Sequence, residues 1–123
     1  MSFILIAAAI GLAAQATAPV APATPPAAPL SQENKALVRC SAAFALVSFG
    51  QETGNADAQK WPAIDPRGRE FFVRALAQVM DETGLQRDAL AGMVQAEAQR
   101  LLDEAQVDAV MPACLTMLEA SGV

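Results

Sequence analysis

Two cysteines, Cys40 and Cys114, carry the most nucleophilic side chains of this sequence. They lie far apart, which excludes the Cys-x-x-Cys arrangement in which a helix N-terminus lowers the pKa of a catalytic thiol. As a metal pair they lack the further ligands that zinc requires, since the chain holds no histidine. An even number of cysteines in a chain with an export signal favours pairing. The sequence therefore predicts one disulfide, between Cys40 and Cys114.

The remaining residues offer little for catalysis. Without histidine, a Ser-His-Asp triad, a Cys-His dyad and imidazole acid–base chemistry are excluded. Ser41 and Ser48 therefore have no imidazole partner, and Lys35 and Lys60 stand among polar residues. The sequence contains neither a glycine-rich phosphate loop nor a Gly-x-Ser-x-Gly motif. We expect a protein that is not an enzyme and that uses no metal and no cofactor.

One segment, residues 60–74, is basic within an acidic chain. The sequence counts 13 acidic and 8 basic residues, a net charge of −5, yet Arg67, Arg69 and Arg74 cluster here. The first two fall in the predicted first turn of a helix, where the helix dipole disfavours cations. One interpretation is an anion or partner contact made by these guanidiniums and neighbouring backbone N–H groups. The other is pairing with acidic residues nearby and on other helices.

The single tryptophan, Trp61, has two interpretations as well. It precedes Pro62, which moves it out of helical geometry. Its ring either folds back onto the core as a plug or stays exposed as an anchor for a partner.

The elements that must position these residues are predicted to be helical. Residues 31–123 lack alternating apolar runs and are rich in Ala, Leu, Gln, Glu and Arg, which favour helix. We expect an all-α, four-helix bundle-like domain stapled by the disulfide. The predicted helices cover about residues 32–49, 66–83, 86–105 and 108–120, with residues 51–64 as a connector.

Local signals set the expected limits of these helices. Ser31 is the predicted N-cap of the first helix, and Gly50 and Gly54 its end. For the second helix we expect Asp65 as N-cap, Pro66 at the first position and Gly84 at the end. For the third helix we expect Gly92 to permit a close contact with another helix. Because proline breaks helix interiors, Pro112 predicts a turn over 108–111 and a final helix that begins at Pro112.

Apolar residues at helical spacing indicate the buried faces. The first helix is predicted to be the central one, since it carries no charge after Arg39. The expected core residues are Leu37, Cys40, Phe44 and Val47 in the first helix, Phe72, Leu76, Val79 and Met80 in the second, Leu90, Met93, Val94, Leu101 and Leu102 in the third, and Met111, Cys114, Leu115 and Leu118 in the last.

The N-terminal residues predict export. Residues 3–14 form an uncharged apolar run, too short to span a bilayer, followed by Ala14-Gln15-Ala16. This pattern predicts a signal peptide over 1–16, and the alternative is an apolar helix that is retained. Residues 17–30 contain 5 prolines and predict an extended, disordered Ala/Pro-rich tether before the domain at 31–123. After cleavage no stable membrane insertion is expected, and the predicted location is periplasmic or secreted.

The layout of export signal, tether and small helical domain with two cysteines resembles the HdeA-type periplasmic acid-stress chaperones, which are small, helical and carry one disulfide. This resemblance implies unfolding and client binding at low pH. The other hypotheses are a binding module for an unknown envelope protein, using an apolar patch or residues 60–74, and a carrier of a small ligand or anion at that basic segment. Nucleic acid is excluded as a partner by the acidic charge and the absence of tyrosine.

Overall fold

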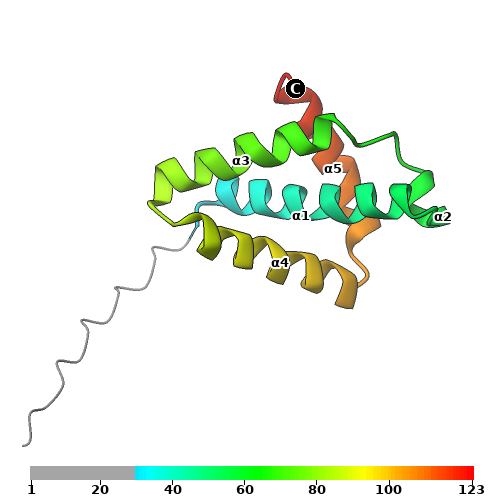
Figure 1. Cartoon of the computed structure of the whole chain (residues 1–123), viewed down its shortest axis with the longest axis horizontal. Helices are drawn as coiled ribbons and strands as arrows, with labels where there is room; N and C mark the ends of the chain where they lie inside the picture. The colour runs from blue at the N-terminus through cyan, green and yellow to red at the C-terminus, as the bar shows by residue number, and fades with distance from the viewer. Residues whose placement is uncertain (1–29) are drawn as a thin grey trace, which may run out of the picture.

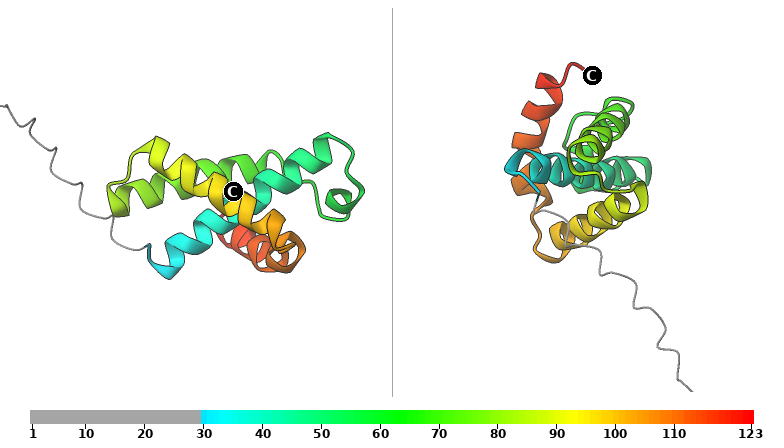
Figure 2. Two further views of the ribbon diagram at one scale, coloured as in Figure 1. Left: turned by 90° about the horizontal axis from the view of Figure 1, so that it is seen from below. Right: turned by 90° about the vertical axis from the view of Figure 1, so that its left-hand side faces the viewer.

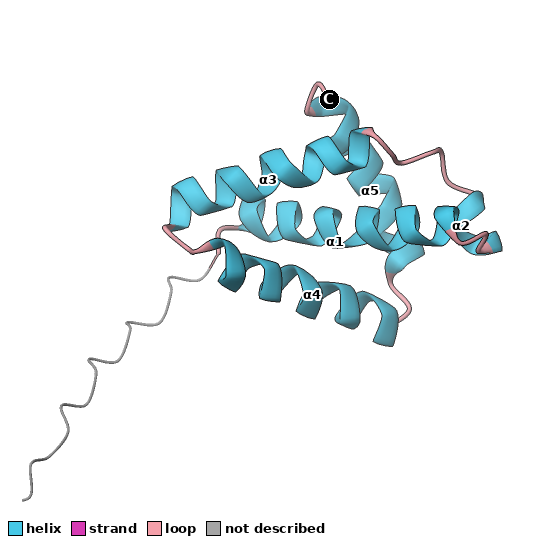
Figure 3. Ribbon diagram, in the orientation of Figure 1, coloured by secondary structure: helices cyan, strands magenta, loops and turns pink. Residues whose placement is uncertain are grey.

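The computed structural model describes residues 30–123, and all regular structure in that part of the chain is helical (Figure 3). The helices are α1 (Gln32–Glu52), α2 (Ala56–Gln59), α3 (Arg67–Thr83), α4 (Arg87–Asp103) and α5 (Val107–Ala120). The predicted all-α class is confirmed, with one helix more than expected, because the short α2 forms within the connector. The predicted signal peptide at 1–16 and tether residues 17–29 lie outside the described residues. Within residues 30–123, no helix is both long and apolar enough to cross a membrane.

Helix α1 is the central element, as predicted, and it contacts every other helix. In Figure 1 it runs through the middle of the domain, with α3 above it and α4 below it. Figure 2 shows that α4 crosses α1 at an angle and that α5 stands on another side of α1. Helices α4 and α5 do not pack extensively against each other, since each is held mainly by α1.

The limits of α1 agree with the sequence at one end and differ at the other. The Ser31 side chain accepts a hydrogen bond from the Asn34 N–H at 3.1 Å, which confirms the predicted N-cap. The helix continues through Gly50, however, and ends at Glu52. Gly50 is required for a different reason: a Cβ there would lie 2.6 Å from the Ala58 Cβ. The glycine lets α2 pack directly against α1.

The start of α3 corrects the predicted cap. Asp65 does not cap the helix; it accepts a hydrogen bond from the Ser48 Oγ of α1 at 2.7 Å, and Pro66 occupies the cap position without a side-chain bond. A Cβ at Gly68 would overlap the Ile64 side chain, so this glycine permits the close turn into α3. The other end is as predicted, because Gly84 ends α3 in the left-handed conformation with a φ of 72°.

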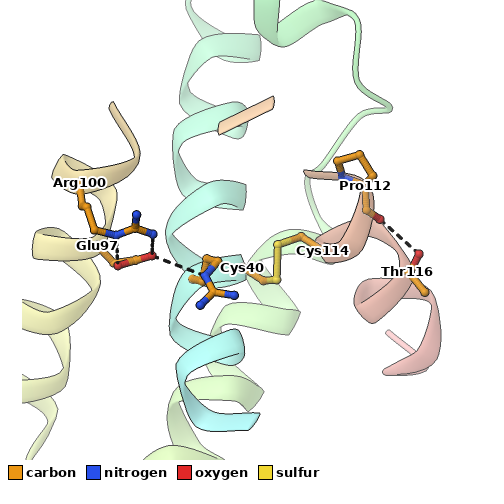
Figure 4. Close-up of a disulfide and its surroundings, with 7 residues drawn as sticks. Cys40, Glu97, Arg100, Pro112, Cys114 and Thr116 are labelled. Carbon is orange, nitrogen blue, oxygen red and sulfur yellow. Dashed lines mark hydrogen bonds and ion pairs between the residues drawn. A yellow bond between two sulfur atoms is a disulfide. The ribbon is translucent and has the colours of Figure 1, made fainter. Parts of the chain in front are cut away.

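The last two helices correct two further expectations. Gly92 makes no close helix contact, since no atom lies within 4 Å of where its Cβ would be. Helix α5 begins at Val107 and not at Pro112, which lies inside it. Pro112 is exposed, so water can satisfy the carbonyl oxygen that loses its intrahelical partner. The Thr116 hydroxyl donates to the Pro112 carbonyl at 3.2 Å (Figure 4).

The core forms where α1 meets α3, α4 and α5. The predicted α1 face is fully buried, and the Phe44 ring meets the Phe71 ring of α3 edge-on, with ring centroids 5.2 Å apart. On α3, the centre of the buried face is shifted by one residue from the prediction, because Phe71, Ala75 and Val79 are buried while the other expected residues are only half-buried. The buried residues of the last two helices are Leu90, Val94, Leu101, Met111, Cys114 and Leu118.

The predicted disulfide is confirmed. Cys40 of α1 and Cys114 of α5 are bonded, with their Cα atoms 5.2 Å apart, and both are almost fully buried. Figure 4 shows the bond crossing directly from one helix to the other. The first and last helices of the domain are therefore covalently joined at the centre of the core.

Candidate binding groove

A groove of about 500 Å³ lies where the C-terminal ends of α1 and α4 meet α2 and the start of α5. We call this the end groove. Its lining residues come from α1, α2, α4, α5 and the connectors between them. Figure 1 shows the C-terminal ends of α1 and α4 at the same end of the domain. The apolar residues that define it are Leu46, Phe49, Trp61, Leu101, Leu102 and Val107.

Two of these residues expose large apolar surfaces. Among residues 30–123, the large hydrophobic side chains that are strongly exposed are Phe49, at 66%, Leu102, at 55%, and Val73, at 62%. The first two line the end groove, although they come from different helices, whereas Val73 is not part of its lining. Single exposed apolar residues are ordinary in proteins, but a group of them around a groove marks an interaction surface.

Trp61 is placed in this groove by a polar clamp. The Gln51 side chain of α1 donates from Nε2 to the carbonyls of Ala58, Trp61 and Pro62, at 3.2, 3.2 and 2.9 Å. Its Oε1 accepts from the Ile64 N–H at 3.1 Å. One α1 side chain thus fixes the backbone of the connector over seven residues.

The two interpretations of Trp61 meet in this position. The indole is half-buried and packs against the core, and it also forms part of the groove lining. The residue that plugs the core more completely is Ile64, at 1% exposure, which the sequence analysis did not single out. The Trp61 Nε1 is buried and has no hydrogen-bond partner among residues 30–123. The Trp61 ring thus forms an aromatic wall of the groove.

The charged residues of the lining are both carboxylates, Asp57 and Asp108. The Lys60 Nζ lies 2.5 Å from the Asp108 Oδ2 and 5.6 Å from the centroid of the Trp61 ring. The ammonium of Lys60 holds the pKa of Asp108 below its ordinary value. Of the two lining carboxylates, Asp108 is thus already paired with Lys60.

Comparisons with family models, curated proteins and solved structures found no match. The resemblance to the HdeA-type chaperones accordingly stays a prediction from the layout alone. What the groove can do follows from its own chemistry: it offers an aromatic and aliphatic surface with an acidic edge. Such a surface binds apolar groups by removing them from water.

The arginines of the basic segment have different surroundings. The Arg67 guanidinium donates to the Glu119 carboxylate at 2.9 Å and to the Val123 carbonyl at 2.8 Å, so it fastens the C-terminal residues to α3. Arg69 lies 3.8 Å from Asp65 and is largely exposed, and Arg74 is exposed further along α3. The Gly68 N–H donates to the Ile64 carbonyl at 2.8 Å. The anion contact predicted for these arginines stays a prediction.

The polar groups outside the groove include an ion-pair network around Glu97 and a buried serine, Ser41. Glu97 of α4 accepts two hydrogen bonds from Arg100, at 2.6 and 3.0 Å, and lies 3.8 Å from Arg39 of α1 (Figure 4). The hydrogen bonds from Arg100 are the largest cause that lowers the pKa of Glu97. Ser41 is completely buried and its hydroxyl has no partner. Within the described part of the chain, no cluster of three or more potential metal ligands is present.

Sequence reasoning singled out Trp61 but missed the groove around it. Leu102 was expected in the core, because helical spacing alone does not show where a neighbouring helix ends. A better signal for Phe49 is its place at the end of a long apolar helix, next to a connector that contains Trp61. No sequence signal shows that Leu102 faces the same space.

Proposed function

We propose that this chain is an exported, non-enzymatic binding module whose end groove holds an apolar segment of a partner protein. The observation that carries the proposal is the convergence of Phe49 and Leu102, two strongly exposed apolar side chains from different helices, on one groove. Covering the exposed part of each side chain contributes about 1–2 kcal/mol. Together with the half-buried Trp61, they form a compact set of anchors of the kind that dominates protein interfaces.

Export is supported by the disulfide and by the N-terminal sequence. A buried Cys40–Cys114 bond is stable in oxidising compartments and rare in the reducing cytosol. The apolar run at residues 3–14 and the Ala14-Gln15-Ala16 pattern indicate the route. The proposed location is therefore the periplasm or the exterior of the cell, with an envelope or extracellular protein as partner.

Site-specific photo-crosslinking in living cells tests this proposal. A photoreactive amino acid replaces Leu102 in the full chain, and Val73, which is equally exposed and lies outside the groove, provides the matched control. We expect a discrete crosslinked partner from position 102 and none from position 73. Crosslinks of equal yield and identity at both positions, or none at position 102, would contradict binding in the groove.

A further inference from the structure

We infer that the partner segment carries a lysine or arginine beside its apolar residues, and that this cation binds at Asp57 on the edge of the end groove. The inference rests on the proposed function and makes the partner's chemistry specific. It starts from the charges that the groove presents: both charged side chains in its lining are carboxylates.

The two carboxylates differ in whether they already have an ion-pair partner. Asp108 is already paired with Lys60, whose ammonium lies 2.5 Å from it and also faces the Trp61 ring. Asp57 is exposed and forms no ion pair within residues 30–123. Lys60, the cation beside the groove, is thus already paired, and the lining carboxylate without an ion pair in the described residues is Asp57. A partner cation at that position restores charge balance without competing with an existing pair.

The surroundings of the groove strengthen this selection. Asp103, which follows the lining residue Leu102 at the end of α4, is exposed and also forms no ion pair in the described chain. Negative charges without a partner beside an apolar surface attract a basic segment during encounter and disfavour an acidic one. Apolar contact thus supplies affinity, and the acidic edge supplies selection among apolar segments.

The chain's own N-terminal residues do not have this chemistry. No charged residue precedes Glu33 in the sequence, so the Ala/Pro-rich segment 17–29 has no side chain to pair with Asp57. If that segment were the occupant, the groove would show no preference for basic flanks. Equal binding of peptides with basic and acidic flanks would reveal that case.

The test measures binding of two short fluorescent peptides to the full chain by fluorescence anisotropy. The peptides share one alanine–leucine core and differ only in flanking lysines or flanking glutamates. We expect the lysine-flanked peptide to bind at least about fivefold more tightly, with a preference that weakens as salt is raised. Asp57→Asn should remove most of the preference, and Asp57→Lys should reverse it.

Asp81→Asn is the matched control, since Asp81 is an exposed carboxylate on α3 that is not part of the groove lining. It should leave the preference unchanged. Equal binding of both peptides to the unaltered chain, or loss of preference in both Asn variants alike, would overturn the inference. Binding that ignores charge but is lost on Leu102→Gln would leave the proposed groove standing, whereas no binding of either peptide would count against both proposals.

Discussion

Removal of the Cys40–Cys114 disulfide is expected to cost this domain a large part of its stability. The bond joins cysteines 74 positions apart in the sequence, so it closes nearly the whole helical domain into one loop. For a loop of that length, the lost conformational entropy of the unfolded chain corresponds to about 4 kcal/mol at 25 °C. Domains of this size have total stabilities of about 5–14 kcal/mol. The double variant should therefore stay folded, with its free energy of unfolding reduced to about 1–10 kcal/mol.

The structure shows why little else replaces the bond. Beyond apolar packing, α5 is held by the Lys60–Asp108 and Arg67–Glu119 ion pairs, which are exposed. Exposed ion pairs contribute at most about 1 kcal/mol each. Alanine is the appropriate replacement for both cysteines, because a serine hydroxyl would be buried without a partner.

Urea unfolding followed by circular dichroism measures the loss. We expect the midpoint of Cys40→Ala/Cys114→Ala to fall by the equivalent of about 4 kcal/mol. A reducing agent should bring the unaltered chain close to the variant's midpoint and leave the variant itself unchanged. A loss below about 1 kcal/mol would refute the reasoning, because it would show that the closed loop does not limit the unfolded chain.

Four further substitutions examine the packing, the charges and the connector. Gly68→Ala should destabilise the domain by about 1–3 kcal/mol, since the new Cβ would overlap the fully buried Ile64. Gly92→Ala, with open space around the new Cβ, should stabilise the domain by up to about 1 kcal/mol. Thermal unfolding should therefore show a lower midpoint for the first variant and a higher one for the second. Glu97→Gln should lower stability at neutral pH by at most about 1 kcal/mol. Because the pKa of Glu97 is lowered in the folded state, its contribution is present above the ordinary glutamate pKa and is lost as the pH falls through the folded value, so urea titrations of the variant and the unaltered chain should converge in acid. A difference that persists in acid would mean that the side chain acts through packing. Gln51→Ala should release the connector and shift the emission of the single tryptophan to longer wavelength, and an unchanged spectrum would show that the clamp is dispensable.

The helical class, the central position of α1 and the disulfide were predictable because each depends on a pattern within the sequence. The apolar spacing from Leu37 to Val47 identifies a buried face without knowledge of its neighbours. The two cysteines lie on apolar faces, and an even number of cysteines behind an export signal favours pairing.

The features that were not predicted depend on tertiary contacts. Asp65 has the sequence pattern of a helix cap, yet its carboxylate accepts a hydrogen bond from the Ser48 hydroxyl, which is far from it in sequence. Gly50 looks like a helix end, yet it serves as the contact point for α2. Leu102 continues an apolar stripe beyond the point where other helices cover it. The end groove is the sum of such local deviations, which is why helical periodicity did not reveal it.

The measurement that tests the groove most directly is peptide binding to two matched variants. Leu102→Gln places a polar group in the groove, and Val73→Gln makes the same kind of change on an exposed apolar residue outside it. With the lysine-flanked peptide in fluorescence anisotropy, Leu102→Gln should weaken binding about tenfold and Val73→Gln should leave it unchanged. Equal affinities for both variants and the unaltered chain would contradict the proposal that the end groove is the binding site.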